Sequence, residues 1–488
     1  MAEDQVALVV DMDGTLLRAD SLHEAIVRHV VQRPLTLISL LGWLRRGKVE
    51  FKRRLADVTL CQPDSLPFNP SVIEALRQAR ASGRRTALVS AADFRQVELV
   101  ARHCDLFDEV IGTGSPQASG VNLSGEAKAA AIRSLYGDGQ YDYIGDSQSD
   151  IPVWASARKA FVVMLSPALA GEAAAKGIAL SALDALSESF RLREVLRGLR
   201  PHQWAKNLLV LVPVLASHQL GLSLAAILAM VAFCLVSSSI YVINDIVDLP
   251  SDRAHPTKRH RPYASGQLSI PTGMFVSVGL LLAGFGIAAS LVNWLFAGVL
   301  AVYLVMTMAY SLLLKRKLLV DILVLAGLYT LRIVAGSAAT GIPLSPWMLA
   351  FTMFIFFSLA AIKRQSELLE LQRRKKEVTP GRGYLTTDLP LVRTMSIASG
   401  QSSVLVFALY VSNARISELY SEPLFLWGIC PVLFYWLSRL ELLTHRGFMS
   451  DDPVVFAMTD RTSQFCIAVM GVLALLAATT SFMPVLVE

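Results

Sequence analysis

Nine apolar runs in the chain after residue 205 constrain its fold more than any other feature. A helix that crosses a bilayer needs about 20 mostly apolar residues, and its backbone polar groups must bond within the segment. The first run is short, and a hairpin of two half-spans or a tilted helix is an alternative for it. The sequence predicts an all-α, nine-span membrane domain with approximate runs at 206–219, 222–243, 273–291, 293–314, 318–340, 346–362, 394–413, 423–438 and 464–485.

The basic residues predict the sidedness of these runs. The loops after the second, fourth, sixth and eighth runs hold 18 Lys and Arg residues, and the opposite loops hold one, Arg415. Lys and Arg near the ends of spans favour the cytoplasmic side. The polar N-terminus shows no signal peptide. We expect a multi-pass protein of a bacterial-type inner (plasma) membrane, with the N-terminus in the cytoplasm and the oligomeric state left open, a homo-oligomer included.

The first 200 residues are different in composition, with 24 Lys and Arg against 24 Asp and Glu. The whole net charge of +6 therefore belongs to the membrane half, where it indicates a membrane face rather than a nucleic-acid surface. No nucleic-acid partner is expected. The five cysteines stand far apart without a C-x-x-C pair, so no disulfide or zinc framework is indicated.

The stretch NDIVDLPSDRAHPTKRHRP directly follows the second run and holds three acids. Acids contribute little to membrane topology, so Asp245, Asp248 and Asp252 need another explanation. On a continued helix, Asn244 and Asp248 are four residues apart and Asp245 and Asp248 three, which gathers their oxygens on one side. Pro250 leaves open whether the helix reaches Asp252. Clustered hard oxygen ligands of this kind suit Mg²⁺.

Basic side chains stand next to these acids. His255, Lys258 and Arg261 can donate to phosphate oxygens, and acids that hold a metal beside bases that hold phosphate suggest a diphosphate substrate. The alternative is a solvated interfacial loop whose acids and bases pair with one another. A second charged cluster, YSLLLKRKLLVD, lies between the fourth and fifth runs on the same predicted side and favours the site.

These motifs resemble a known family. NDIVDLPSDRAHPTKRHRPYASG resembles the first aspartate-rich motif, N-D-x-x-D-x-x-x-D, of the UbiA-type intramembrane prenyltransferase superfamily. Five further motifs resemble its decaprenyl-phosphate phosphoribosyltransferase-like branch over most of residues 198–465: LRPHQWAKNLLV, YSLLLKRKLLVD, LRIVAGSAATGIPLSPW, KRQSELLEL and DDPVVFAMTDR. The resemblance implies the all-helical UbiA-type fold.

One departure from the superfamily points to the donor substrate. Aromatic prenyltransferases of the superfamily carry a second D-x-x-x-D cluster between spans four and five, whereas this chain retains Asp321 alone, with Lys315 and Lys317 nearby. Ammonium groups in place of a carboxylate exchange metal ligation for phosphate contact, which suits 5-phosphoribosyl 1-diphosphate (phosphoribosyl diphosphate). The resemblance implies that the phosphate oxygen of a polyprenyl phosphate attacks the ribose C1 and displaces diphosphate.

The residue roles follow from this interpretation. Asp245 and Asp248 are expected to be catalytic through Mg²⁺. The expected metal ligands of the membrane site are Asn244, Asp245, Asp248, Asp252 and Asp321. The expected substrate-binding residues of that site are His255, Lys258, Arg261, Tyr310, Lys315, Lys317, Arg332, Lys206 and Lys363.

Three of these bases have a structural alternative. A guanidinium at membrane depth is functional or paired inward, so a structural ion pair is the alternative for Arg332. Lys206 and Lys363 lie at interface positions, where snorkelling of the long side chain to water is the alternative.

The soluble half begins with VALVVDMDGTLL, an apolar strand that ends in two acids. Four further strands are expected in RRTALVSAAD, FDEVIGTG, YDYIGDSQSD and AFVVML, with helical stretches between them. Strands that alternate with helices predict an α/β domain with a parallel sheet. In such sheets the functional side chains lie at the carboxyl ends of the strands.

The soluble half resembles the haloacid dehalogenase superfamily of phosphatases over about residues 5–170. D-x-D-G-T is followed at suitable distances by a Ser, a Lys and G-D-S-x-S-D. The resemblance implies that Asp11 is a nucleophile, that Asp13 is a general acid and base, and that Ser90 and Lys128 bind the transferring oxygens. The implied Mg²⁺ ligands are Asp11, Asp13, Asp146 and Asp150. Helix N-capping by these acids and an inactive, regulatory domain are the alternatives.

About 65 residues separate the first two phosphatase motifs and are expected to form a small helical cap on the Rossmann-like sheet. Within them, LTLISLLGWL followed by RRGKVEFKRR fits packing on the core or contact with anionic lipid. The predicted domains are a phosphatase domain with cap at 1–180, an amphipathic linker at 181–200 and a UbiA-type transmembrane domain at 201–488.

Together the two halves predict a bifunctional enzyme that transfers 5-phosphoribosyl to a polyprenyl phosphate and then removes the 5-phosphate. Two rivals remain: an aromatic-acceptor prenyltransferase that uses a prenyl diphosphate, with a phosphatase of unrelated or regulatory role, and a transporter or lipid-binding protein. Charges confined to one face disfavour a path through the membrane.

Overall fold

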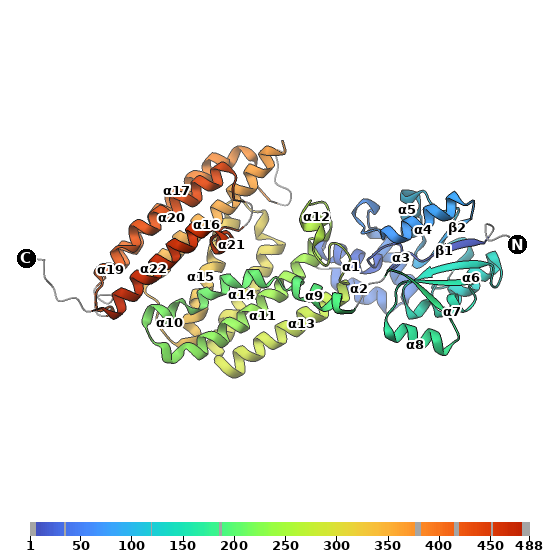
Figure 1. The fold of residues 1–488 in the computed structure, drawn as a ribbon, viewed down its shortest axis with the longest axis horizontal. Coiled ribbons are helices and arrows are strands. Elements are labelled where there is room, and N and C mark those ends of the chain that lie inside the picture. Colours follow the sequence, from blue (N-terminus) through green and yellow to red (C-terminus); the bar gives the residue numbers. More distant parts are fainter. Residues whose placement is uncertain are drawn as a thin grey trace, which may run out of the picture. The chain divides into compact units, whose positions relative to one another are not determined.

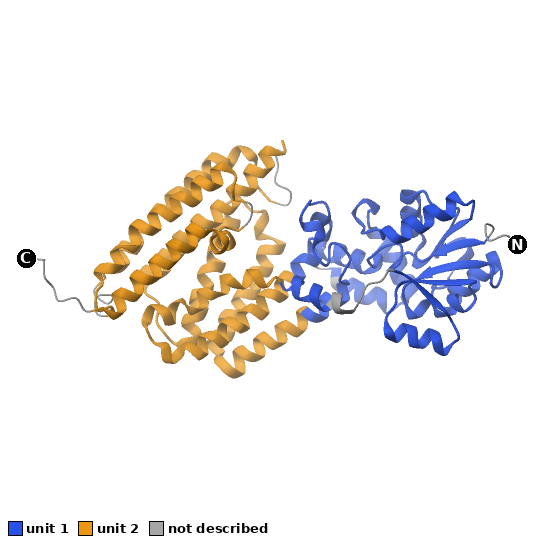
Figure 2. Ribbon diagram, in the orientation of Figure 1, with its two compact units in different colours: residues 1–199, 242–276 blue, residues 200–241, 277–488 orange. Residues whose placement is uncertain are grey.

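The computed structural model describes residues 6–33, 36–118, 120–184, 188–375, 382–413, 419–449 and 452–480. Arg415 and the end of the ninth predicted run therefore lie outside the described residues. The chain forms two compact units (Figure 2). Unit 1 comprises Met1–Leu199 and Val242–Val276, and unit 2 comprises Arg200–Tyr241 and Ser277–Glu488.

Unit 1 contains a β-sheet near the N-terminal end of the chain (Figure 1). The sheet has six strands in the order β3-β2-β1-β4-β5-β6. All of its strand pairs are parallel, which confirms the predicted parallel α/β fold. The strands are β1 Ala7–Val10, β2 Thr86–Asp93, β3 Glu109–Thr113, β4 Tyr141–Gly145, β5 Lys159–Met164 and β6 Leu180–Asp184.

Both faces of this sheet are buried, as a parallel sheet requires. Successive side chains of a strand point to opposite faces, and in β1 the side chains of Leu8 and Val10 join one apolar cluster. Ala7 and Val9 join the cluster on the other face. This double burial explains why the first strand is apolar at every position.

The helices of unit 1 include those that pack on the two faces of the sheet and others that belong to the cap and to residues 242–276. They are α1 Ser21–Gln32, α2 Leu37–Leu44, α3 Lys48–Val58, α4 Pro70–Ala81, α5 Phe94–Cys104, α6 Glu126–Tyr136, α7 Ile151–Ala155, α8 Pro167–Ala175, α9 Glu188–Gly198 and α12 Leu249–Arg253. The stretch 181–200, predicted as a linker, thus contains most of β6 and the whole of α9. A sixth strand was not predicted there, because LSALD is too short and mixed to show strand periodicity.

The predicted helical cap is present as α1, α2 and α3. In α2 the buried Leu40 and the half-buried Trp43 pack on the core. The other side of this helix exposes large apolar side chains, with Ile38 at 80% and Leu41 at 60% exposure. The alternative of core packing is therefore observed for one side of the helix, and contact of the other, apolar side with anionic lipid stays a prediction.

Unit 2 is built from helices alone in its described residues. They are α10 Val212–Ser217, α11 Ser223–Val247 up to Tyr241, α13 Ile270–Ile287 from Ser277, α14 Trp294–Leu312, α15 Val320–Thr340, α16 Pro346–Arg373, α17 Leu389–Val411, α19 Leu424–Trp427, α20 Ile429–Arg446, α21 Pro453–Thr459 and α22 Arg461–Thr479, with 3₁₀ segments η6 Pro201–Leu211, η7 Leu220–Leu222, η10 Leu314–Arg316 and η11 Thr386–Asp388 and a π segment, η9 Ala288–Val292.

Eight segments in the described residues are long and apolar enough to cross a membrane. They contain α11, α13, α14, α15, α16, α17, α20 and α22. The first predicted run, which is short in the sequence, does not form one helix of that length, so eight of the nine predicted runs form membrane-length helices in the described residues. The run divides into η6 and α10, because Pro213 lacks an N–H and lies in the first turn of a new helix.

Candidate functional site

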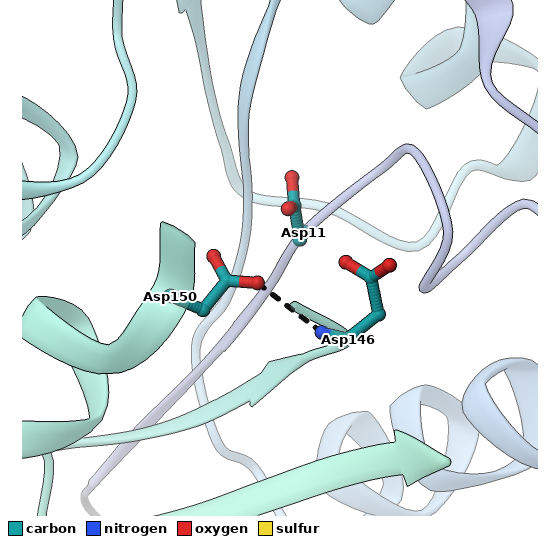
Figure 3. Close-up of side chains that lie close together, drawn as sticks. All are labelled: Asp11, Asp146 and Asp150. Carbon is teal, nitrogen blue, oxygen red and sulfur yellow. Dashed lines mark hydrogen bonds between the residues drawn. The ribbon is translucent and has the colours of Figure 1, made fainter. Parts of the chain in front are cut away.

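Three acids converge at the carboxyl ends of β1 and β4 (Figure 3). Asp11 follows β1, Asp146 follows β4, and Asp150 lies in the 3₁₀ turn η5, Gln148–Asp150. Because β1 and β4 are neighbours in the sheet, their ends bring together residues that are 135 positions apart. The three ligand oxygens lie within 4.8 Å of one another, and no other described group of three or more His, Cys, Asp or Glu residues does so.

Lys128 from α6 forms ion pairs with two of these acids. Its buried ammonium lies 2.8 Å from Asp11 Oδ2 and 3.0 Å from Asp150 Oδ1. Tyr143 donates to the same Asp150 oxygen at 2.7 Å. In turn, Asp150 Oδ2 accepts from the backbone N–H of Asp146 at 3.2 Å. The acids are therefore held in place before any substrate binds.

The electrostatics of the cluster fit a divalent cation. Burial raises the pKa of Asp11 to about 6, and burial together with the charges of Asp11 and Asp150 holds the pKa of Asp146 well above its usual value. Burial also acts on Asp150, but Lys128 outweighs it and lowers that pKa. Three acids against one ammonium leave negative charge in excess, and clustered carboxylates are the hard donors that Mg²⁺ takes.

Asp13 does not belong to this group of three clustered acids, although it was predicted as a metal ligand. Its Oδ1 accepts from the backbone N–H of Ser21 at 2.8 Å. Burial, followed by the charge of Asp20, raises its pKa to about 7. Ser90, in β2, is buried and accepts from the Ala92 N–H at 3.1 Å. Asp13 thus suits proton transfer better than metal ligation.

Gly14 permits Asp146 to approach the cluster. It has a φ of +76°, and a Cβ at this position would lie 2.2 Å from Asp146 Oδ2. If the three acids hold Mg²⁺, we expect Gly14→Ala to lower both the Mg²⁺ affinity and the kcat/KM for p-nitrophenyl phosphate by about 10- to 100-fold, the usual effect of displacing a ligand's support. Hydrolysis of p-nitrophenyl phosphate over a Mg²⁺ titration measures both.

Gly83→Ala is the matched control for this prediction. Gly83 has a φ of +77° with no atom within 4 Å of its built Cβ, so it carries the same backbone strain without the clash. Equal activity losses in the two variants would attribute the effect of Gly14→Ala to strain and contradict the role given to its missing side chain.

The predicted metal ligands after the second run lie where α11 ends. The backbone N–H of Asp248 still bonds to the Asn244 carbonyl at 2.9 Å. Asp248 then caps the short helix α12, in whose first turn Pro250 lies. The helix therefore restarts, and Asp252 is placed by a second helix, which resolves the question that Pro250 left open.

Arg261 lies between two of these acids. Its Nη1 is 3.2 Å from Asp245 Oδ1 and 2.6 Å from Asp252 Oδ2. Both acids are buried, at 2% and 3% exposure. In the neighbouring turn, Nδ1 of His255 accepts from the backbone N–H groups of Thr257 and Lys258.

Asp245 and Asp252 thus lie on the same guanidinium group, that of Arg261, and both form ion pairs with it. Among the described residues, the acids of this segment do not form a second group with mutual ligand distances as short as those at Asp11. Arg261, predicted to bind phosphate, contacts carboxylates instead. The donor set of carboxylate and amide oxygens, in which Asp245 and Asp252 are buried and Asn244 and Asp248 are half-buried, still fits Mg²⁺, and the ligand roles remain predictions.

In unit 2, Asp452 gathers two of the predicted bases. Lys206 Nζ lies 2.6 Å and Lys363 Nζ 3.2 Å from Asp452 Oδ2. The hydroxyl of Tyr329 donates to the same carboxylate at 3.0 Å. Lys206 is only 7% exposed. The snorkelling alternative for it is therefore wrong, because its ammonium is inside the helical unit.

Arg332 lies against the same Tyr329. Its guanidinium is 5.4 Å from the centre of that ring and 5.1 Å from the centre of the Tyr303 ring. It donates to Asn207 Oδ1 at 2.9 Å and to Tyr303 Oη at 3.1 Å. Within the described part of the chain, no carboxylate forms an ion pair with it, so the structural ion pair alternative is not found.

Lys206, Lys363, Arg332 and Asp452 are named here the cationic cluster. Three bases and one acid leave a surplus of two positive charges. Desolvated charge at membrane depth costs roughly 2.5 to 3.5 kcal/mol per residue on insertion scales, so a surplus of this kind favours the binding of an anion.

Asp321 lies in a different and balanced network. Its carboxylate is fully buried, 2.6 Å from Arg364 Nη2, and accepts from the Tyr384 hydroxyl at 2.5 Å. Arg382 reaches it at 3.7 Å, and both guanidinium groups also pair with Glu367. Two acids thus meet two bases. Losing one partner of such a buried pair costs about 3 to 5 kcal/mol, so Asp321 contributes to the stability of this network, and its role as a metal ligand stays a prediction.

Of the other predicted substrate-binding residues, Tyr310 contacts this network, because Arg382 donates to its hydroxyl at 3.4 Å. Lys315 lies in η10, and Lys317 follows it with an exposed side chain.

Sequence reasoning missed several residues of these two networks. The omitted side chains are Asn207, Tyr303, Tyr329, Glu367, Arg382, Tyr384 and Asp452. One signal was available, because Asp452 belongs to the motif DDPVVFAMTDR. Tyrosines inside apolar runs carry no such signal.

Comparison with known proteins places both halves. Residues 208–458 match the model of the UbiA prenyltransferase family, and residues 8–154 match that of haloacid dehalogenase-like hydrolases.

Three curated relatives illustrate the similarity. An uncharacterized protein, y4nM, of Sinorhizobium fredii is 35% identical over 94% of this chain and 89% of its own length. The nodulation protein NoeC of Azorhizobium caulinodans is 39% identical over 55% of this chain and 88% of its own. A decaprenyl-phosphate phosphoribosyltransferase of Mycolicibacterium smegmatis is 37% identical over 55% of this chain and 87% of its own.

Proposed function

The chain belongs to the UbiA prenyltransferase family and carries a haloacid dehalogenase-like hydrolase domain, and from this premise we propose that it is a bifunctional membrane enzyme. Its membrane domain transfers 5-phosphoribosyl from phosphoribosyl diphosphate to a polyprenyl phosphate. Its hydrolase domain then removes the 5-phosphate, which leaves polyprenyl-phosphoryl ribose. Similarity to a decaprenyl-phosphate phosphoribosyltransferase supports the transfer step.

The surplus charge of the cationic cluster is the observation that carries the proposal. Both proposed substrates are rich in phosphate, and buried ammonium and guanidinium groups form the strong, charge-assisted hydrogen bonds that phosphates accept. The balanced network around Asp321 disfavours the rival aromatic prenyltransferase, for which a second metal-binding acid cluster is expected at this position.

In the transfer step, a phosphate oxygen of the lipid forms a bond to the ribose C1. The bond between C1 and the diphosphate oxygen breaks, and diphosphate leaves with the electron pair. Lys206, Lys363 and Arg332 bind and orient the anionic groups. Asn244, Asp245, Asp248 and Asp252 would hold Mg²⁺, which would supply charge stabilisation for the leaving diphosphate.

In the hydrolase domain, Asp11 attacks the phosphorus of the 5-phosphate and an aspartyl-phosphate forms. Asp13 protonates the departing O5 of the ribose and then takes a proton from the water that hydrolyses the intermediate. Lys128 holds Asp11 in position at 2.8 Å. Asp11, Asp146 and Asp150 would hold Mg²⁺, which would offset the negative charge of this site.

A cytoplasmic position of both sites is part of the proposal. Residues 242–276 share a compact unit with the hydrolase domain, which supports a position of both on the same side of the membrane. The chain crosses the membrane once through α11 before residue 242. To begin and end on the same side, it must therefore also cross between residues 200 and 222. The 11 residues of η6 and six of α10 reach at most about 31 Å at 3₁₀ and α-helical rises, close to the roughly 30 Å of the hydrocarbon core.

The test uses the purified protein with ribose-labelled phosphoribosyl diphosphate, decaprenyl phosphate and Mg²⁺. We expect labelled lipid and released diphosphate in equal amounts, followed by inorganic phosphate. A parallel reaction offers a prenyl diphosphate with a hydroxybenzoate acceptor. If no ribose label reaches the lipid in the first reaction, the proposal is overturned. If the prenyl group is transferred to hydroxybenzoate in the second reaction as well, the rival takes its place.

A further inference from the structure

Arg253 of α12 forms a buried ion pair with Glu24 of α1. The guanidinium donates from Nη2 to Glu24 Oε1 at 2.6 Å and from Nη1 to Glu24 Oε2 at 2.8 Å. Both side chains are only 9% exposed. Arg253 also donates to the carbonyls of Ser65 and Ala264 at 2.7 and 2.8 Å. A buried, bidentate ion pair with further hydrogen bonds fixes the position and orientation of the two helices it joins, whereas an exposed ion pair contributes little.

Apolar packing surrounds this ion pair within unit 1. Buried side chains of residues 242–268 form one cluster with Val27 of α1 and with Val195 and Leu199 from the end of the hydrolase part. The cluster residues from the membrane half are Val242, Ile246, Leu249, Tyr263, Ala264 and Leu268. The contact therefore has an apolar core beside its charged pair.

A close backbone approach completes the contact. Gly266 has a φ of +75°, and a Cβ there would lie 2.3 Å from the carbonyl oxygen of Arg18. Arg18 belongs to the loop that follows Asp11 and Asp13. No side chain fits at position 266 unless the two segments separate.

The same segment carries the acids proposed to hold Mg²⁺ in the transfer step. Asp252 directly precedes Arg253 in α12, and Arg261 joins Asp252 to Asp245. We propose that helix α1 of the hydrolase domain positions the aspartate-rich segment of the membrane transferase, with Glu24 and Arg253 as positioning residues, so that transfer requires the docked soluble domain. The claim that transfer requires this contact rests on the proposed transfer function. The claim that α1 positions the segment does not.

Glu24→Gln in the full-length protein tests the positioning. We expect backbone hydrogen exchange over residues 244–253 to accelerate by about tenfold, because the segment opens locally more often. Transferase kcat should fall by about 10- to 100-fold, the effect of small misplacements of reacting groups. The KM for decaprenyl phosphate and the hydrolysis of p-nitrophenyl phosphate should change by less than about twofold.

Glu98→Gln is the control, because it removes the same charge from the exposed pair with Arg102. Gly266→Ala separates the same two segments without a change in charge. It should also accelerate hydrogen exchange over residues 244–253 and lower transferase kcat. The exchanged pair Glu24→Arg with Arg253→Glu should restore exchange protection at least in part.

Unchanged exchange over 244–253 in both Glu24→Gln and Gly266→Ala would overturn the inference. The same holds for faster exchange with full transferase activity. If the native protein transfers no phosphoribosyl at all, the proposed function fails, and the exchange measurement still decides whether α1 positions the segment.

Discussion

Replacement of Asp245 and Asp248 together by Asn is expected to lower phosphoribosyl transfer by at least about 10³-fold, the equivalent of roughly 4 kcal/mol of lost transition-state stabilisation. An amide keeps the size of each side chain but removes the negative charge that holds a divalent cation against diphosphate. The rate of label transfer from phosphoribosyl diphosphate to decaprenyl phosphate measures the effect, together with its dependence on Mg²⁺ concentration.

The hydrolase domain serves as the internal control for this variant, because Asp11 and its partners are untouched. Hydrolysis of p-nitrophenyl phosphate should stay within about twofold of the native rate. Asp388→Asn, in the separate turn η11, controls for the loss of an acid elsewhere. A double variant that still transfers phosphoribosyl at the native rate would remove the aspartate-rich segment from the centre of the mechanism.

Asp11→Asn is expected to lower phosphate release by at least about 10⁴-fold, as loss of a covalent nucleophile usually does. The amide oxygen is a poor nucleophile, so no aspartyl-phosphate forms. Transfer should continue, because the variant leaves the membrane domain intact. The labelled lipid product should then keep its 5-phosphate, which mass spectrometry distinguishes from the ribose product.

The exposed Asp64, whose side chain is 86% exposed, supplies the matched control as Asp64→Asn. It should release phosphate at the native rate. If Asp11→Asn released 5-phosphate from the lipid as quickly as the native protein, the hydrolase domain would not be the source of that step. A loss of transfer in the same variant would instead indicate that the two reactions share more than the contact at α1.

The hydrolase-like half was largely predictable because its candidate functional residues follow the ends of strands. A buried parallel strand is apolar at each position, as in β1, and the polar residue that follows it must lie at the edge of the sheet. Asp11 and Asp146 could be assigned in this way. The sequence did not indicate that Asp13 is held by the Ser21 N–H rather than among the ligands, since this depends on the path of the following loop.

The membrane half was predictable in its helices but less so in its polar contacts. Hydropathy finds spans because lipid requires each one to satisfy its own backbone. It does not find the partner of a polar side chain within the bundle. Asp452 meets Lys206 across 246 positions and Tyr329 across 123, and the predicted metal ligand Asp321 meets Arg364 instead.

The sequence by itself determined the two halves, the parallel sheet, the apolar spans and the acids of both motifs, because each depends on local periodicity or on a short run of residues. Only the tertiary structure decided which charges meet. Glu24 and Arg253 are 229 positions apart, and nothing local marks either as the other's partner. Burial removes both from water, and the low dielectric around them makes a matching charge obligatory, but the fold alone chooses which one.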